Sequence, residues 1–208
     1  VESQGHRLAY LAVNEHLLKN SSEPVIVFVH GILASVNFWR DCVPREFAGN
    51  RAWYSLSLPG HHPSTVSAAY EPSDVDANWF FRIMDGALKN LLGTRKAIII
   101  GHSTGGFCAL NLAAHGAENV AAFISVAGFH KGNWGGFEGL LVKFAGLGKW
   151  TKDLFVANLR LFQKNKTVQR LLTASLAFDS AGYLSNPLSQ RLLENIFWVT
   201  HHVPNTAN

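Results

Sequence analysis

The stretch AIIIGHSTGG at positions 97–106 decides the fold of this chain. Residues 97–100 form a short apolar run, which predicts a strand buried on both faces. The residues GHSTG at 101–105 match the pattern G-x-S-x-G and lead into a helix predicted over 105–115. A strand that turns sharply into a helix at this pattern exposes the serine hydroxyl at the carboxyl end of the sheet. We therefore predict that Ser103 is a nucleophile.

Small residues and a second loop support this prediction. Side chains at three positions around the serine would collide with neighbouring backbone, which accounts for Gly101, Gly105 and Gly106. The loop HGIL at 30–33 follows another apolar run, and in such a fold it lies beside the nucleophile. A backbone N–H of this loop and that of Thr104 can hold the negative oxygen of a tetrahedral intermediate, and the positive end of the helix dipole adds to the effect.

Strands and helices alternate on both sides of this stretch up to about residue 128. Apolar runs with β-branched residues predict strands, and periodic apolar or small-residue stretches predict helices. The predicted strands cover 6–13, 25–29, 52–58, 97–100 and 120–126, and the predicted helices cover 35–46, 73–92 and 105–115. This alternation implies an α/β fold with a mostly parallel, doubly wound sheet that has helices on both faces.

Two of these helices carry signals at their ends. Ser73 and Asp76 form a capping-box pattern at the start of the helix predicted over 73–92, and Gly93 follows its last residue as a C-cap. Pro44 is expected to kink or end the helix predicted over 35–46.

The character of the sequence changes after residue 128. Residues 129–208 indicate several helices rich in Phe, Leu and Trp, with a single candidate strand at 196–199. We therefore divide the chain into the N-terminal part of an α/β core, 1–128, and a helical lid, 129–208. A row of apolar lid residues is expected to form lid core and pocket lining rather than a membrane-contacting face: Trp134, Phe137, Leu140, Leu141, Phe144, Leu147 and Trp150.

The composition limits the classes of function. Hydrophobic residues make up 48% of the 208 and charged residues 15%, which indicates a globular chain. The net charge is +4 without a run of five like charges, so nucleic-acid binding is not expected. No apolar stretch approaches the roughly 18 to 20 residues of a membrane span, and no signal peptide is visible. Cys42 and Cys108 are expected to be buried free thiols, which favours a reducing, cytoplasmic location.

Four stretches occur in the order and spacing of a known family: Val27–Gly31, Ser35 with Phe38-Trp39, Leu58–His61 and Ile99–Gly106. On these residues the chain resembles the α/β-hydrolase superfamily, in particular its lid-bearing esterases, lipases and C–C hydrolases. The resemblance implies Ser103 as nucleophile and the main-chain amides of Ile32 and Thr104 as oxyanion donors. It also implies a serine hydrolase that cleaves a carboxylic ester or a similar carbonyl bond of an apolar small molecule without a cofactor or metal.

The histidines of these motifs have predicted supporting roles. His30 and His102, together with Gly31, are expected to brace two loops rather than to exchange protons. These are the oxyanion loop at 30–33 and the elbow, which is the turn at 101–105 that carries Ser103. The pairs at 61–62 and 201–202 have no third ligand at a known spacing, so we expect loop histidines rather than a zinc site.

The resemblance also implies an acid and a histidine after Ser103, and the sequence offers no residues that fit. The loop at 127–131 contains no carboxylate, and His201-His202 follow a lid helix rather than a last core strand. The remaining carboxylates lie in the predicted lid: Glu138, Asp153, Asp179 and Glu194. We therefore expect a chain that is cut off before its last strands and its triad are complete. These 208 residues alone are expected to precipitate, because an apolar sheet edge stays open, and to show no esterase turnover.

Several activities stay open on the same scaffold, because fold does not fix function. Acyl transfer, cofactor-free haloperoxidase-like activity and C–C bond cleavage are the alternatives within enzymes. A non-catalytic protein that holds a ligand in the same pocket is the alternative outside them. The sequence does not define the substrate, its acyl chain length or the oligomeric state.

Overall fold

A computed structural model describes residues 1–32, 34–69, 71, 75–130, 140, 143–144, 146–175 and 177–202. The chain divides into two compact units, of which the first holds Val1–Phe129 and the second begins at His130. The two units are described separately below.

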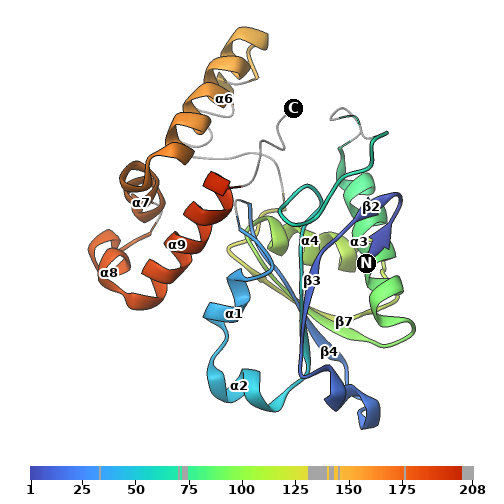
Figure 1. The fold of residues 1–208 in the computed structure, drawn as a ribbon. Coiled ribbons are helices and arrows are strands. Elements are labelled where there is room, and N and C mark those ends of the chain that lie inside the picture. The colour runs from blue at the N-terminus through green and yellow to red at the C-terminus, as the bar shows by residue number, and fades with distance from the viewer. Residues whose placement is uncertain are drawn as a thin grey trace. The chain divides into compact units, whose positions relative to one another are not determined.

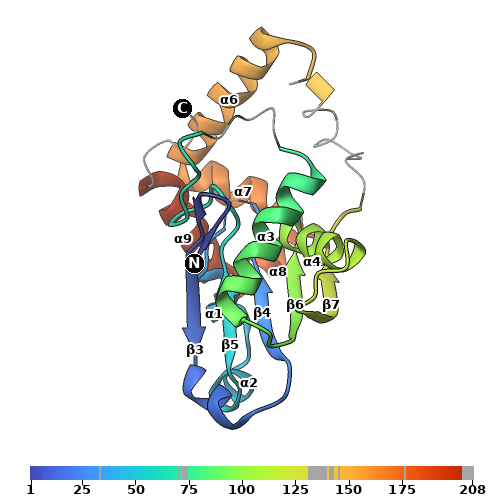
Figure 2. The same cartoon turned by 90° about the vertical axis from the view of Figure 1, so that its right-hand side faces the viewer.

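The first unit is built on a mixed five-stranded sheet with the order β3-β5-β4-β6-β7, which Figure 2 shows from left to right. The edge strand β3 runs antiparallel to β5, and every other neighbouring pair is parallel. The predicted mostly parallel sheet is therefore confirmed. Its strands are β3 (Tyr10–Val13), β4 (Val25–Val29), β5 (Trp53–Leu56), β6 (Ala97–His102) and β7 (Val120–Val126).

Helices cover both faces of this sheet, as predicted (Figures 1 and 2). On one face α3 (Ala77–Leu92) and α4 (Thr104–Ala114) pack on the larger apolar cluster, which includes the valines at 25, 27 and 29. On the other face α1 (Phe38–Cys42) and α2 (Arg45–Asn50) pack on a smaller cluster around Ile26, Phe28 and Trp53. Successive residues of β4 thus serve opposite faces, which is why the whole strand is apolar.

Three predicted elements differ most from their predicted bounds in the structure. The strand predicted over 6–13 is divided into β2 (His6–Arg7), which pairs with β1 (Glu2–Ser3), and β3. The helix predicted over 35–46 is interrupted, because Pro44 forces the preceding Val43 into an extended conformation between α1 and α2. The helix predicted over 73–92 begins only at Ala77, where the Asp76 carboxylate accepts a hydrogen bond from the Trp79 N–H at 2.6 Å. The predicted capping partner Ser73 lies outside the described residues.

The second unit is helical in its described part. It contains α6 (Lys149–Lys164), α7 (Lys166–Ser175), α8 (Ser180–Ser185) and α9 (Pro187–His202). The strand considered at 196–199 is wrong, because these residues lie inside α9. Of the predicted lid row, Leu147 and Trp150 are 77% and 72% exposed and so do not belong to the core of this unit. Trp134, Phe137 and Leu141 lie outside the described residues. In the described part of the chain, no helix combines the length and the apolar character needed to cross a membrane.

Candidate active site at the end of strand β6

Ser103 sits at the junction of β6 and α4 in a backbone conformation that few residues adopt. Its φ is 53° and its ψ is −116°, a left-handed region that L side chains enter only under strain. Two main-chain hydrogen bonds hold it there: its N–H donates to the Val126 carbonyl at 2.9 Å, and its carbonyl accepts from the Phe107 N–H at 3.0 Å. Strain of this kind persists where the surrounding structure over-determines it, and it concentrates at functional sites.

The glycines around Ser103 are required by close backbone contacts. A Cβ on Gly101 would overlap the carbonyl of Gly105, and a Cβ on Gly105 would overlap the carbonyl of Val29 at the end of β4. A Cβ on Gly106 would lie 2.8 Å from the Cα of Gly128, which follows β7. The sharp bend therefore depends on positions where two neighbouring strands and α4 meet without side chains between them.

The loop after β4 lies directly against the serine. A Cβ on Gly31 would be 3.0 Å from the Ser103 Cβ and 3.2 Å from the backbone oxygen of His102. Ile32 follows in a turn, with its side chain 58% exposed. Thr104 is the first residue of α4, so its N–H has no acceptor within the helix. The structure thus brings the predicted oxyanion loop and the predicted nucleophile together, while Leu33 lies outside the described residues.

His30 is fully buried beneath that loop and joins it to the loop after β5. Its Nδ1 lies 2.7 Å from the Gly31 carbonyl oxygen, and its Nε2 accepts a hydrogen bond from the Leu58 N–H at 3.2 Å. Burial lowers the pKa of His30 to about 3, and the nearby His61 lowers it further. The imidazole is therefore neutral at physiological pH and suited to bracing rather than to proton transfer.

His102 occupies the position before the serine. Its ring stacks on Phe38 with the centroids 5.3 Å apart, and among the described residues its buried Nδ1 has no hydrogen-bond partner. A Cβ on Gly31 would be 3.2 Å from this Nδ1. Burial lowers the pKa of His102, so this ring is also neutral at pH 7.

Aromatic residues that the sequence analysis did not single out form a wall of half-buried rings along α4. Phe107, one helical turn from Ser103, stacks on Phe129 with 5.2 Å between ring centroids and 6° between planes. The ring centroid of Phe80, in α3, lies 5.8 Å from the ring centroid of Phe107. These phenylalanines come from α3, from α4 and from the segment after β7, so no spacing in the sequence signals the cluster.

Asp153 and Asp179, two of the carboxylates of the second unit, have structural partners. Asp153 pairs with Lys149 at 3.1 Å, and Asp179 caps α8 by accepting from the Gly182 N–H at 2.9 Å. Glu138 and the side chains of His201 and His202 lie outside the described residues. Among the residues described, no group of three His, Cys, Asp or Glu side chains could hold a metal ion.

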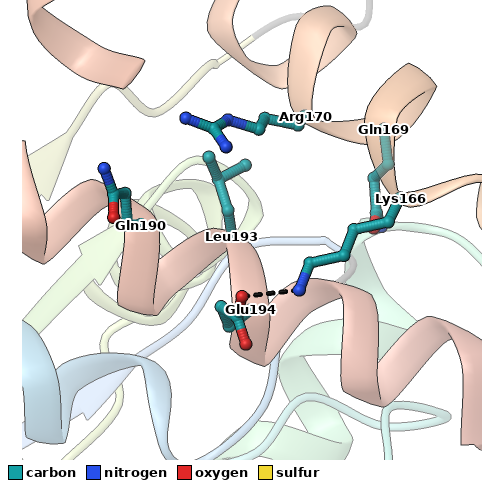
Figure 3. Close-up of a pocket in the computed structure, with 6 residues that line it drawn as sticks. All are labelled: Lys166, Gln169, Arg170, Gln190, Leu193 and Glu194. Carbon is teal, nitrogen blue, oxygen red and sulfur yellow. Dashed lines mark hydrogen bonds and ion pairs between the residues drawn. The ribbon is translucent and has the colours of Figure 1, made fainter. Parts of the chain in front are cut away.

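The second unit contains a cavity of about 50 Å³. Figure 3 shows the side chains that line it. Glu194 accepts from Lys166 there at 2.5 Å, and Arg170 and Gln190 both donate to the carbonyl of Leu184 at the end of α8. Lys166 and Glu194 therefore pair with each other, and Arg170 and Gln190 satisfy the carbonyl at the helix end.

A mostly parallel sheet with a strained serine between strand and helix defines an α/β protein of the hydrolase type. The chain belongs to the α/β hydrolase fold family, whose profile matches residues 24–207. No curated protein sequence matches the chain.

Solved structures agree with this assignment. The enol-lactonase from Burkholderia xenovorans LB400 is 19% identical, with 97% of this chain and 67% of its own chain covered and a TM-score of 0.64. A hydrolase from Pseudomonas aeruginosa PA01 is 16% identical, with 95% and 65% covered and a TM-score of 0.65. The meta-cleavage product hydrolase from Pseudomonas fluorescens IP01 is 17% identical, with 93% and 61% covered and a TM-score of 0.62. This chain thus spans 61–67% of the length of these structures, and identities this low establish the fold alone.

Proposed function

We propose that this chain carries the nucleophile and the oxyanion loop of a serine hydrolase. The reaction is the cleavage of a carboxylic ester, or of a similar carbonyl bond, in an apolar small molecule. The observation that carries the proposal is the strained backbone of Ser103, with φ at 53°, packed against Gly31 at the end of β4. A strained serine beside a glycine loop is the arrangement that acyl transfer needs.

In the proposed mechanism, Ser103 Oγ attacks the carbonyl carbon while a histidine takes its proton. The negative oxygen of the tetrahedral intermediate accepts hydrogen bonds from the main-chain N–H groups of Ile32 and Thr104. Each such donor contributes about 3 to 4 kcal/mol to the transition state. The histidine returns the proton to the leaving alcohol, and water then hydrolyses the acyl-enzyme. In the part of the chain that the structure describes, no hydrogen bond joins Ser103 Oγ to an imidazole, so none of the described histidines is assigned this role.

The half-buried phenylalanines at 80, 107 and 129 support an apolar substrate, because their neighbouring rings start one helical turn from the nucleophile. The neutral His102 adds no charge beside the serine. Among nitrophenyl esters, kcat/KM is therefore expected to rise as the acyl chain becomes longer.

The experiment compares Ser103→Ala with the native protein in two assays. Nitrophenyl ester turnover is expected to fall by about 10³-fold or more, and covalent labelling by a fluorophosphonate probe to disappear. Ser22→Ala, at an exposed turn of the same unit, is the matched control and is expected to change neither assay. Unchanged turnover in Ser103→Ala would contradict the proposal.

The alternative activities differ in what the same assays release. An acyltransferase passes the acyl group to an added alcohol in preference to water. A C–C hydrolase splits a diketone but leaves the nitrophenyl esters largely intact. A non-catalytic binder neither turns over esters nor takes up the fluorophosphonate, yet still binds the apolar ligand.

A further inference from the structure

The loop after β5 is attached to the loop after β4 through buried polar side chains. Ser57 is fully buried, and its Oγ lies 3.2 Å from the His30 Nε2 and 3.2 Å from the carbonyl oxygen of His61. The Leu58 N–H donates to the same Nε2 at 3.2 Å. The ring of His61 packs edge-on against His30 with centroids 5.3 Å apart.

These contacts fix which nitrogen of His30 carries the proton. Nδ1 faces a carbonyl oxygen, that of Gly31, which can only accept, so Nδ1 must donate. Nε2 faces the Leu58 N–H, which can only donate, so Nε2 must accept. The hydroxyl of Ser57 can both donate and accept, so its proton is shared between Nε2 and the His61 carbonyl. A proton on both nitrogens would set Nε2–H against the Leu58 N–H.

The end of this loop, at Ser64 and Thr65, is also held by hydrogen bonds. The Ser64 N–H donates to the His61 carbonyl at 2.7 Å, and the Ser64 hydroxyl accepts from the Ala9 N–H at 3.0 Å. Thr65 exchanges two backbone hydrogen bonds with Arg7, at 3.0 and 2.8 Å. The loop after β5 is thus a fixed support for His30, and a Cβ on Gly31, the next residue in the chain, would lie only 3.0 Å from the Ser103 Cβ.

We propose that Ser57 and His30 are positioning residues, which hold the oxyanion loop at the correct place beside Ser103. They do so because the loop after β5 fixes the tautomer of His30. Neither side chain touches substrate; both act through the backbone of residues 30–32. The inference rests on the proposed function, because the loop matters only if Ile32 and Thr104 bind an oxyanion. It adds to that function a second loop on which the geometry of the oxyanion hole depends.

The first test measures ester turnover of variants at Ser57 and at His30, the two residues whose side chains connect the loops. His30→Asn keeps a polar group near the position of Nδ1 but not near that of Nε2. This variant and Ser57→Ala are each expected to lower kcat about tenfold, with KM changed by less than about twofold. His30→Gln places its amide oxygen near the position of Nε2 and is expected to recover most of that loss.

The control is His115→Gln, because both ring nitrogens of His115 also face hydrogen-bond partners, although this residue is exposed and lies away from the site. Its Nδ1 lies 2.9 Å from the Asn111 carbonyl, its Nε2 lies 3.2 Å from Asn78 Oδ1, and its ring stacks on Phe81. This variant is expected to leave kcat unchanged. If Ser57→Ala and His30→Asn lower stability but not kcat, the two residues are merely structural and the positioning proposal is overturned.

The second test reads the tautomer without any turnover. Nitrogen NMR of histidine-labelled protein is expected to show His30 with a proton on Nδ1 and none on Nε2, and without titration between about pH 5 and 8. A proton on Nε2, or a midpoint in that range, overturns the positioning proposal.

The two proposals fail in different ways. If Ser103→Ala leaves turnover unchanged, the function falls and the positioning role falls with it, whatever the NMR shows. If Ser103→Ala abolishes turnover while Ser57→Ala and His30→Asn keep the native kcat, only the positioning role falls.

Discussion

The strands β4 and β7 look alike as sequences and differ in how the structure covers them. Both are uninterrupted runs of apolar and small residues, VIVFV and VAAFISV. Every residue of β4 is buried, with Phe28 4% exposed, whereas most of β7 is exposed, with Phe123 at 40% and Ile124 at 51%. In the described part of the chain β4 is central and β7 is the edge strand beyond β6. An apolar run therefore predicts a strand but not what covers it.

The largest expected effect tests the contact between the end of β4 and the elbow. Gly105→Ala places a Cβ against the Val29 carbonyl, which no side-chain rotation relieves. We expect a loss of about 4 kcal/mol or more in the free energy of unfolding, measured by chemical denaturation. Gly49→Ala, where a Cβ would meet nothing within 4 Å, is the control and is expected to stabilise α2 by about 0.5 to 1 kcal/mol. A small loss at Gly105 would mean that β4 and α4 are not in close contact.

The second prediction sets the two strands against each other directly. Phe28→Ala removes a ring that lies between Trp39 and Trp53, with centroid distances of 4.8 and 5.4 Å. It is expected to cost about 3 to 5 kcal/mol. Phe123→Ala on β7 is expected to cost about 1 kcal/mol or less, because that ring is already partly in water. Equal losses would show that β7 is covered as completely as β4.

The third prediction concerns pH and the histidine at the end of β4. Between about pH 6.5, where the unfolded His30 titrates, and its folded pKa of about 3, the unfolded chain binds a proton that the folded chain does not. Stability therefore decreases as pH falls through this window, by about 1.4 kcal/mol for each pH unit. Burial lowers the pKa of His61 and His102 as well, and these groups act in the same direction.

The measurement is the free energy of unfolding of the native chain and of His30→Gln from about pH 7 to about pH 4. The native chain is expected to lose stability more steeply than the variant over this range. Parallel curves for the two proteins would contradict the role assigned to the buried imidazole.

The smallest thermodynamic effect is expected on the face of β7. Ile124→Lys is expected to change stability by only about 0.5 kcal/mol, because the side chain is half exposed. It is nevertheless expected to reduce the precipitation of the 208-residue chain, because a lysine opposes pairing of an apolar edge with another chain. Static light scattering against concentration provides the measurement, and equal scattering by both proteins would count against an aggregation-prone edge.

Local signals were enough to predict the elbow. The run at 97–100, the glycines and the serine act within about one strand and one helical turn, so their spacing carries the geometry. The break at Pro44 and the C-cap at Gly93 are local in the same sense and were predictable. The support for His30 was not, because Ser57 is 27 residues away and nothing in its sequence context marks it.

The second unit shows most clearly what the sequence pattern could not predict. In α7 the structure buries Gln169, at 2% exposure, and leaves Leu171 and Leu172 at 57% and 45%. A pattern of apolar residues predicts the helix but not this choice of face, which is set by the contacts of α7 with α8 and α9.

The sequence alone therefore determined the alternating elements, the strained serine and the family resemblance, since all three rest on residues close together in the chain. Only the tertiary structure decided which strand is covered, which histidine is locked in one tautomer and which faces of the helices are buried. The physical reason is that burial and hydrogen bonding between distant segments depend on partners that no local pattern specifies.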